Sequence, residues 1–456
     1  MNFSIDDTIA AISAPPGGGI GMVRLSGENA FAIAESVWRG KRGWEDHSVN
    51  YGKIADGAVV IDEVLLVAMR APKTYTMEDI VEINCHGGAR AMQAVLSLLL
   101  ANGARLAEPG EFTKRAFLNG RIDLSQAEAV LDLIEAKTAL SHKAAVSQLD
   151  GRLSRQVQTM TARILSALAH IEAAIDYPEH DEIGLTMAQV RTETEAALAQ
   201  ADKLLQTASG GRILREGLET VIIGSPNVGK SSLLNALLNE DRAIVTSIPG
   251  TTRDTLSETV SVGGIPLILT DTAGIRLTDD EIEKIGVERS KRRAETADLL
   301  LYMIDGSAPL AQADVEAVRE NAAGGRKMLV LINKEDVAAQ ADESVLAAIA
   351  GVENVLRISA KTEEGLPRLA ARIQALFCNG IDTENGMLLT NVRHIDALTR
   401  ARRSLAAALE TIDNGLPEDF VSIDLRAAYD SAGELTGETA DGDVLDSIFA
   451  QFCLGK

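Results

Sequence analysis

The chain has 456 residues, enough for about two to four domains. Its 44 Lys and Arg against 66 Asp and Glu give a formal net charge of −22, which argues against indiscriminate nucleic-acid binding through a broad basic face. Aromatic residues make up only 3% of the chain, so we expect substantial helix content rather than an all-β fold.

The three cysteines, Cys85, Cys378 and Cys453, are far apart and form no metal-ligand pattern, which suits a reducing compartment. The N-terminus shows no basic region followed by a long apolar run, and no segment approaches membrane-spanning length. We therefore expect a cytoplasmic protein that does not enter a membrane.

Residues 1–120 alternate β-branched runs with amphipathic stretches, and Pro/Gly clusters separate them. This pattern predicts an α/β N-terminal domain. We expect its strands within 7–14, 20–26, 64–70 and 79–85, and its helices within 27–38 and 90–103.

Residues 121–213 have the period of long amphipathic helices. Ser125 and Glu128 have the spacing of a capping box, which predicts a helix start at Ser125. The run "SGG" at 209–211 is expected to end this helical region.

Residues 214–380 alternate short apolar strands with helices, which predicts a doubly wound sheet of parallel strands covered on both faces. Helical periodicity returns over 381–456, so we expect one helical domain split by an inserted α/β domain. The expected strands are 218–224, 266–271, 298–305, 327–333 and 355–360.

The stretch "GSPNVGKSS" (224–232) fits the pattern of a phosphate-binding loop and lies between a predicted strand and a helix. Gly224 and Gly229 allow the backbone to curl around phosphate oxygens, and the helix N-terminus adds positive potential. Lys230 is expected to reach the β- and γ-phosphates, and the Ser231 hydroxyl to bind Mg²⁺. A glycine-rich turn without a ligand is the alternative, and the strand–loop–helix context argues against it.

Three further motifs follow predicted strands in order. "DTAG" begins at Asp271, near the Mg²⁺ shell, and Gly274 can turn its N–H toward the γ-phosphate. "NKED" ends at Asp336, whose carboxylate, if buried, can accept two N–H groups of guanine and so select GTP. "SAK" can offer a backbone N–H to the guanine oxygen. The GTP-binding residues expected from these motifs are Asn227, Val228, Gly229, Lys230, Ser231, Ser232, Asp271, Thr272, Ala273, Gly274, Asn333, Lys334, Asp336, Ser359, Ala360 and Lys361. The family resemblance given below adds Thr246, Ser247, Ile248, Pro249, Gly250, Thr251 and Thr252.

One position raises a question about catalysis. In a Ras-type switch protein the residue after "DTAG" is a glutamine that orients the attacking water. Here it is Ile275, whose side chain cannot form a hydrogen bond. Hydrolysis therefore needs another group, or the protein is a switch that does not hydrolyse its nucleotide.

The whole chain resembles the MnmE (TrmE) family of tRNA-modification GTPases. The motifs that carry the resemblance are "APPGGGIGMVRLSG" near the N-terminus, "PGTTRDT" (249–255), the hydrophobic Ile275 and the terminal "FCLGK". The resemblance implies an α/β folate-binding N-domain, a split helical domain and an inserted Ras-like P-loop GTPase domain. The implied boundaries are 1–120, 121–213, 214–380 and 381–456.

The resemblance also implies an activity. Together with a FAD-containing partner, MnmG (GidA), such proteins add a (carboxymethyl)aminomethyl group to carbon 5 of the wobble uridine of certain tRNAs. The one-carbon unit comes from a tetrahydrofolate derivative, either 5-formyl- or methylene-tetrahydrofolate. A homodimer through the N-domains is implied as well.

In the family, dimerisation of the GTPase domains and a bound K⁺ replace the missing glutamine. Positive charge there opposes the negative charge that develops on the γ-phosphate. The matching K⁺ ligands are Asn227, Thr246, Ile248 and Thr251, and Thr252 matches a Mg²⁺ ligand. Glu283 matches the glutamate that orients the water, and Arg276 is a further candidate. Pro249 departs from the family pattern, because a small residue such as Ala is expected there.

Arg24, Glu82, Arg121 and Lys456 match the folate-contacting positions of the family. Cys453 is a candidate for a reactive thiol near the folate, with a buried packing cysteine as the alternative. Arg400, Arg402, Arg403 and the run 291–293 are weak candidates for RNA contacts, because such clusters are usually solvated helix faces.

Two rival functions remain at this point. A ribosome-assembly GTPase of the Era/EngA type shares the "PGTTRD" motif and the hydrophobic position, but such proteins usually carry an RNA-binding domain after the GTPase domain. The other rival is a regulatory switch that binds a partner without hydrolysis. Rapid turnover of GTP would discriminate against that rival.

Overall fold

The computed structural model describes residues 7–176, 183–240, 257–270, 297–337, 340–378 and 388–456. Contacts between the elements divide the chain into two compact units. One consists of Met1–Leu131 with Gly433–Lys456, and the other of Asp132–Ala432. The first unit thus contains both ends of the chain.

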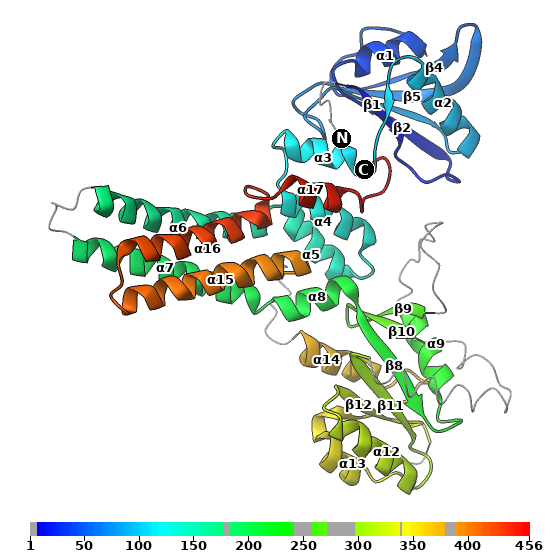
Figure 1. Cartoon of the computed structure of the whole chain (residues 1–456). Helices are drawn as coiled ribbons and strands as arrows, with labels where there is room; N and C mark the ends of the chain where they lie inside the picture. The colour runs from blue at the N-terminus through cyan, green and yellow to red at the C-terminus, as the bar shows by residue number, and fades with distance from the viewer. Residues whose placement is uncertain (1–6, 177–182, 241–256, 271–296, 338–339, 379–387) are drawn as a thin grey trace. The chain divides into compact units, whose positions relative to one another are not determined.

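The first unit is built on a seven-stranded sheet of order β3-β4-β5-β6-β2-β1-β7 (Figure 1). Neighbouring strands are antiparallel, except that β1 and β7 run parallel. The strands are β1 (Ile9–Ile12), β2 (Ile20–Ser26), β3 (Trp38–Arg39), β4 (Ser48–Asp56), β5 (Val59–Met69), β6 (Ile80–His86) and β7 (Arg105–Leu106). Sequence analysis predicted β1, β2, β5 and β6 but not the other three.

Strand β4 was missed because its sequence is polar and contains Gly52 in its middle. The structure explains this glycine: a Cβ atom there would lie 2.4 Å from the ring of Trp38, which is buried against the strand. A position that looks like a strand breaker is therefore required by close packing.

The two faces of this sheet have different surroundings. One face packs on α1 (Ala30–Val37) and α2 (Ala89–Ala101) through an apolar core that includes Leu25, Leu66 and Ile83. The residues that alternate with this core, among them Arg24 and Glu82, lie on the other face. At the β1 end that face is covered by Phe112 of α3 (Glu111–Leu118) and by Tyr75.

The C-terminal segment packs on α3 in the same unit. Lys114 Nζ lies 2.6 Å from Asp446 Oδ1 of α17 (Gly442–Phe449), and the rings of Phe117 and Phe449 are 6.1 Å apart. Gly455 approaches β1 so closely that a Cβ atom would lie 2.3 Å from the Ile12 carbonyl oxygen. The last residues of the chain are therefore part of the N-terminal unit.

Helix α4 (Leu124–Glu135) begins with a different capping box from the predicted one. Asp123 Oδ1 accepts the N–H of Gln126 at 2.9 Å, and Gln126 Oε1 accepts the N–H of Asp123 at 3.0 Å. The prediction that Ser125 and Glu128 form the box was wrong, because Asp123 stands two residues earlier with its own partner at the required spacing.

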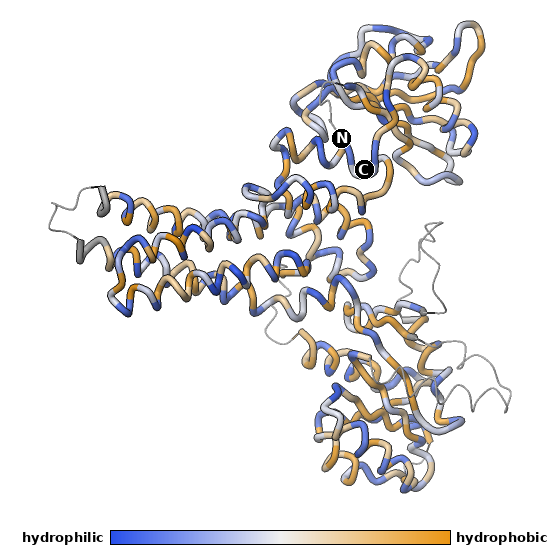
Figure 2. Tube along the Cα trace, viewed as in Figure 1, coloured by the Kyte–Doolittle hydropathy of each residue, from blue (hydrophilic) through white to orange (hydrophobic). Residues whose placement is uncertain are grey.

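In the second unit, helices from before and after the α/β segment pack together, as α7 does with α6 and α15 (Figure 1). Polar and apolar residues alternate along these helices (Figure 2), which is the amphipathic pattern expected from the sequence. The helices are α5 (Ala139–Leu149), α6 (Arg152–Asp176), α7 (Ile183–Leu205), α8 (Ala208–Glu216), α15 (Val392–Asp413) and α16 (Glu418–Thr436).

The prediction that "SGG" at 209–211 ends a helical region was wrong, because α8 runs through it. A Cβ atom on Gly211 would lie 2.2 Å from the Leu389 carbonyl oxygen. The Leu389 N–H donates to Thr207 Oγ1 at 3.1 Å. The glycine thus allows the segment that enters the α/β part to touch the segment that leaves it.

The α/β part has a six-stranded sheet of order β13-β12-β11-β8-β10-β9, in which only β9 runs antiparallel to its neighbour. Apolar cores cover both faces. The strands are β8 (Leu218–Gly224), β9 (Ser257–Val262), β10 (Ile265–Thr270), β11 (Leu299–Asp305), β12 (Met328–Asn333) and β13 (Val355–Arg357). The helices are α9 (Lys230–Glu240), α12 (Gln312–Ala323), α13 (Glu343–Ala350) and α14 (Leu366–Phe377), and a short 3-10 turn, η1 (Val352–Asn354), precedes β13.

The predicted fold class is confirmed: an α/β N-terminal part, helices split by an insertion, and an inserted doubly wound α/β part. The one strand that sequence analysis did not predict in the insertion, β9, has the polar sequence "SETVSV". It lies at the edge of the sheet, where antiparallel strands with polar residues are common.

Candidate functional site

The loop between β8 and α9 is held in its curled shape by two glycines and an asparagine. Gly224, Asn227 and Gly229 have φ values of 151°, 61° and 102°. A Cβ atom on Gly224 would lie 2.3 Å from the Met303 carbonyl oxygen, and one on Gly229 would lie 2.2 Å from Asn333 Nδ2. One of these atoms belongs to the backbone and the other to a buried side chain, so neither can move away to make room. Only glycine therefore fits at these two positions.

Lys230 is the first residue of α9, and its ammonium group is tied to the loop itself. Its Nζ donates to the carbonyl oxygens of Gly224 and Ser225, both at 2.9 Å. Ser231 and Ser232 follow in the first turn, where both are exposed. A cation, two hydroxyl groups and the N–H groups of a helix N-terminus form a set that suits phosphate oxygens and a hard cation.

Asn333, at the end of β12, joins three separate loops. Its Nδ2 donates to the Val228 carbonyl oxygen at 2.7 Å, and its Oδ1 accepts the N–H of Ala360 at 2.9 Å. The side chain is buried. It therefore fixes the phosphate loop and the "SAK" loop against the end of the same strand, as expected for a bracing residue.

The sequence analysis expected a buried carboxylate at Asp336, but the structure places this residue in an exposed position. It lies on the turn after β12, and Ser359 Oγ donates to its Oδ1 at 2.8 Å. A carboxylate held by one hydroxyl group and open on its other side can accept N–H groups from an incoming ligand. Lys361 is exposed on the neighbouring loop.

Sequence analysis missed Asp305, at the end of β11. Lys334 Nζ lies 2.6 Å from its Oδ2, while the N–H and Oγ of Ser307 donate to its Oδ1 at 2.9 and 2.6 Å. Burial raises the pKa of Asp305, but the hydrogen bonds from Lys334 and Ser307 outweigh it and hold the pKa below its usual value. An acidic residue at the carboxyl end of a central parallel strand was the signal available in the sequence.

Several predicted site residues lie outside the described part of the chain. They include the catalytic candidates Glu283 and Arg276, the residue Ile275 and the basic run 291–293. The others are Thr246, Ser247, Ile248, Pro249, Gly250, Thr251, Thr252, Asp271, Thr272, Ala273 and Gly274.

A second candidate site lies on the sheet of the first unit. Arg24 on β2 and Glu82 on β6 are direct cross-strand partners, and Arg24 Nε donates to Glu82 Oε1 at 2.8 Å. The guanidinium carbon of Arg24 lies 5.5 Å from the ring centre of Phe112 and 5.8 Å from that of Tyr75. The pair is thus mostly covered, with about 16% and 17% of the two side chains exposed.

Tyr75 brings a third predicted residue close. The guanidinium carbon of Arg121 lies 4.8 Å from the Tyr75 ring centre, and Arg121 Nη1 donates to the Tyr75 carbonyl oxygen at 3.3 Å. Tyr75 was not predicted as a site residue. An aromatic residue in a Pro-Lys-Thr-Tyr-Thr loop gives no signal until the fold places it between two arginines.

The fourth predicted residue, Lys456, makes no hydrogen bond or ion pair to Arg24, Glu82 or Arg121 within the described structure, although its segment packs on β1. Cys453 is exposed, which contradicts the alternative of a buried packing cysteine. Its carbonyl oxygen accepts the N–H of Gly110 at 3.4 Å.

A buried ion network supports α3 beneath this site. Glu111 accepts hydrogen bonds from Arg105 Nη2 at 2.6 Å and Arg115 Nη2 at 3.0 Å. Arg115 also pairs with Glu78, and Glu78 accepts a hydrogen bond from Ser26 at 2.7 Å. Burial alone would raise the pKa of Glu111, but the bonds from Arg105, the Glu108 N–H and Arg115 hold it below its usual value.

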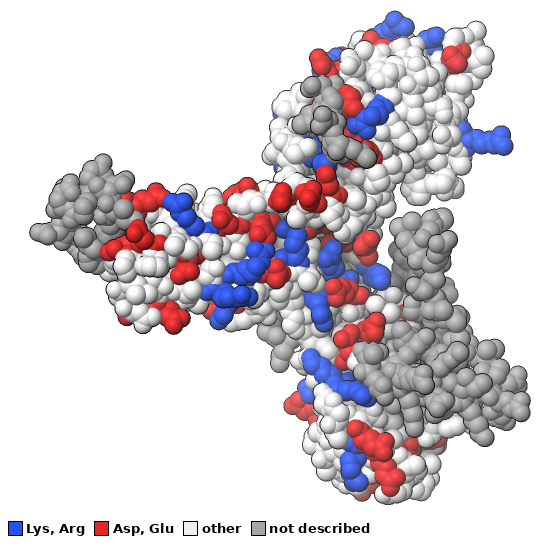
Figure 3. Space-filling view, in the orientation of Figure 1, with Lys and Arg blue, Asp and Glu red and all other residues white. Residues whose placement is uncertain are grey.

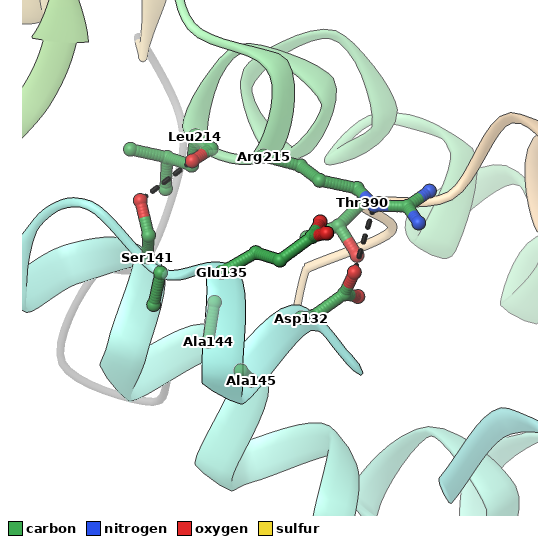
Figure 4. A pocket seen from close by; sticks show the side chains of 9 residues that line it. Asp132, Glu135, Ser141, Ala144, Ala145, Leu214, Arg215 and Thr390 are labelled. Carbon is green, nitrogen blue, oxygen red and sulfur yellow. Dashed lines mark hydrogen bonds and ion pairs between the residues drawn. The ribbon is translucent and has the colours of Figure 1, made fainter. Parts of the chain in front are cut away.

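A small cavity of about 30 Å³ lies between α4, α5 and α8 (Figure 4). Arg215 Nε donates to Asp132 Oδ1 at 2.8 Å there, and Ser141 Oγ donates to the Leu214 carbonyl oxygen at 2.5 Å. The volume suits about one water molecule and is too small for a nucleotide or a folate. We assign it to packing between these helices.

The basic residues of α15 lie among acidic ones (Figure 3). Arg400 Nε lies 3.0 Å from Asp396 and Arg402 Nε lies 2.5 Å from Asp202, while Arg403 is exposed. Such interleaved pairs are typical of solvated helix faces and do not form a continuous basic surface. Within the described ranges, no helix is both long and apolar enough to cross a membrane.

Comparison with known proteins gives two family matches. The model of the GTP-binding protein TrmE N-terminus matches residues 8–121, and that of the MnmE helical domain matches residues 124–453. Among curated relatives, a tRNA modification GTPase MnmE of Lactiplantibacillus plantarum is 49% identical, covering 99% of this chain and 98% of the relative. Proteins of the same name from Listeria welshimeri and Clostridioides difficile are 50% and 46% identical; each alignment covers 99% of this chain, and 99% and 100% of the relative, respectively.

Proposed function

The chain belongs to the family of tRNA modification GTPases named MnmE, and from this premise we propose that it hydrolyses GTP as part of tRNA modification. The observation that carries the proposal is the bond pair of Asn333, which joins the phosphate loop at Val228 to the "SAK" loop at Ala360. A ribosome-assembly function is disfavoured, because the similarity to the MnmE relatives extends over 99% of the chain and is not limited to the GTPase part.

In the proposed nucleotide site, one group of residues binds the phosphates and another binds the guanine base. The N–H groups of the loop 224–229 and Lys230 bind phosphates, and the Asp336 carboxylate reads the guanine edge. The Ala360 N–H is donated to Asn333 Oδ1 and so holds the "SAK" loop in place. Gly224 and Gly229 are packed against Met303 and Asn333, and the curled backbone that they allow suits the binding of a phosphate group by loop N–H groups. Ser231 and Thr252 would hold Mg²⁺ with Asp271 in its outer shell, and the ion would neutralise phosphate charge.

Catalysis without the glutamine is assigned to Glu283, Arg276 and K⁺. Glu283 would orient the attacking water, and K⁺ would supply the positive charge that an arginine provides in other GTPases. Asn227, Thr246, Ile248 and Thr251 would hold the ion. The left-handed backbone of Asn227, with φ of 61°, supports a special role for this residue, because asparagine adopts that conformation at low cost.

Steady-state GTP hydrolysis in K⁺ and in Na⁺ at equal ionic strength tests this mechanism, with Glu283→Ala as the variant. We expect strong stimulation by K⁺ that collapses in the variant. Equal and slow rates in both salts would contradict the mechanism and favour a switch that does not hydrolyse GTP.

Arg24, Glu82 and Arg121 are proposed to bind a tetrahydrofolate derivative, with Lys456 as a further contact and Cys453 as a reactive thiol close by. The residues fit such a ligand: Glu82 can accept N–H groups of a pterin, and the arginines can pair with carboxylates. Tyr75 and Phe112 provide aromatic surface beside them. The ligand would supply the one-carbon unit of the modification.

We further propose that the chain acts as a homodimer through its N-terminal sheet. Tyr51 and Val49 on β4 and Leu65 on β5 lie on the face opposite the helices, with exposed fractions of 68%, 63% and 45%. Apolar side chains gathered on one sheet face are typical of an interface. Loss of the dimer in Tyr51→Glu, measured by sedimentation velocity, is the expected result.

The remaining proposals rest on the family. The chain would act in the cytoplasm with the FAD-containing MnmG to add the (carboxymethyl)aminomethyl group at carbon 5 of the wobble uridine of certain tRNAs. Its four parts would be 1–120, 121–213, 214–380 and 381–456. Co-purification of a yellow, FAD-containing partner with this chain tests the proposed association with MnmG.

A further inference from the structure

An open pocket of about 660 Å³ lies in the first unit beside the proposed folate site. The loop between β5 and β6 and the turn before α4 line it, with Lys73, Thr74, Tyr75 and Arg121 among its residues. A pocket of this size suits a small organic ligand.

The charged residues of this pocket all have one sign. Lys73 and Arg121 are its only charged lining residues, and among the described residues neither side chain has an acidic partner. In a chain with a net charge of −22, a pocket lined by two cations and by no carboxylate favours an anionic ligand.

Tyr75 connects this pocket to the Arg24–Glu82 pair. Its ring lies within 6 Å of the guanidinium carbons of both Arg24 and Arg121, at 5.8 and 4.8 Å. The ring is held in place because its hydroxyl group lies 2.9 Å from Thr113 Oγ1. The next residue, Thr76, is buried and bonded to Ser26 at 2.6 Å. One rigid aromatic ring thus borders the pocket and contacts the arginines of the folate site.

We propose that this pocket binds the glutamyl tail of the folate. Lys73 and Arg121 pair with the tail carboxylates, and Tyr75 packs against the aromatic ring that joins tail and pterin. Because a chain of several glutamyl units carries one more carboxylate with each unit, the protein prefers polyglutamylated folate, and Lys73 sets that preference. The inference rests on the proposed folate binding and adds a specificity-determining residue to it.

The test is isothermal titration of the full-length chain with 5-formyl-tetrahydrofolate carrying one or three glutamyl units. We expect the triglutamate to bind about threefold more tightly, the scale of one partly exposed ion pair. Lys73→Ala brings the ratio of the two Kd values close to one. Lys41→Ala, an exposed lysine of the same unit outside the pocket, leaves the ratio unchanged.

Tyr75 is tested separately. Tyr75→Ala weakens both ligands by about tenfold, whereas Tyr75→Phe, which keeps the ring, weakens them by less than about threefold. Circular dichroism confirms that each variant is folded.

The outcomes separate this inference from the proposed function. If the wild-type chain binds neither folate, the folate function fails and this inference fails with it. If it binds both folates equally, or if Lys73→Ala keeps the preference, only this inference is overturned. If Lys73→Ala instead weakens binding of an anticodon stem-loop RNA and leaves both folate Kd values unchanged, the pocket belongs to RNA and the inference is also overturned.

Discussion

The nucleotide site and the N-terminal site solve the problem of binding an anionic ligand in different ways. The nucleotide site uses backbone geometry: Gly224 and Gly229 shape one loop, and Asn333 holds it through a main-chain oxygen. The N-terminal site uses side chains from separate elements, with Arg24 and Glu82 paired across two strands and Arg121 stacked on Tyr75. The nucleotide site should therefore lose affinity when a Cβ atom is added to one of its glycines, and the N-terminal site should lose affinity when one of its charged side chains is removed.

The largest effect is expected from Gly229→Ala. Its Cβ atom would lie 2.2 Å from Asn333 Nδ2, and the residue has a φ of 102°. Overpacking and backbone strain each cost about 1–3 kcal/mol, so we expect about a thousandfold loss of affinity for a fluorescent GDP analogue. Gly325→Ala is the matched control, because it has positive φ but no atom within 4 Å of its Cβ position. A similar loss in both variants would show that general destabilisation of the fold, and not the filled position in the phosphate loop, is responsible.

Removal of a charge beneath the N-terminal site should affect stability rather than nucleotide binding. Glu111→Ala removes one of the two carboxylates that Arg105 and Arg115 share, and because Asp7 still pairs with both arginines we expect a cost of about 2 kcal/mol. Because the folded-state pKa of Glu111 is lowered, its stabilisation is present above its ordinary pKa of 4.5 and is lost as the pH falls through the lower folded value.

Thermal unfolding between pH 7 and pH 3 measures this effect. The variant should unfold at a lower temperature at neutral pH, and the difference from wild type should shrink in acid. Glu108→Ala, an exposed glutamate three residues away, should follow the wild type. A constant difference across this pH range would argue against the ion network as the cause.

A smaller effect is expected from Glu82→Ala. The substitution removes the acceptor for a pterin and unpairs Arg24, so we expect about tenfold weaker folate binding, typical of a charged hydrogen bond. Binding of guanine nucleotide should not change. Glu63→Ala is the control, because this exposed carboxylate lies on β5 and pairs with Lys53. Equal effects of the two variants on folate titration would mean that only the net charge of the sheet matters.

The smallest effect is expected from Asp305→Asn, which tests the one side-chain ion pair of the nucleotide site described here. Lys334 would lose its 2.6 Å partner, and because both side chains are partly exposed we expect only about threefold weaker binding of GDP. Asp298→Asn, at the other end of β11, should have no effect. A loss as large as that of Gly229→Ala would overturn the distinction between the two sites.

Much of the nucleotide site could be predicted from the sequence, because its residues are close in sequence and each follows a strand. "GSPNVGKSS" and "NKED" keep their spacing in any doubly wound sheet, whose parallel strands end at one edge. Asp305 escaped prediction because a single aspartate at a strand end has no motif around it. Its partner Lys334 is 29 residues further along the chain.

The sequence by itself determined the alternation of strands and helices, the split of the helical part, and the loops that bind a nucleotide. These follow from local backbone preferences and from periodic burial, which act over a few residues. Only the tertiary structure decided the passage of α8 through 209–211 and the meeting of Arg24, Arg121 and Lys73 around Tyr75. Those features depend on which competing partner comes within reach, and that distance is set by the fold of the whole unit.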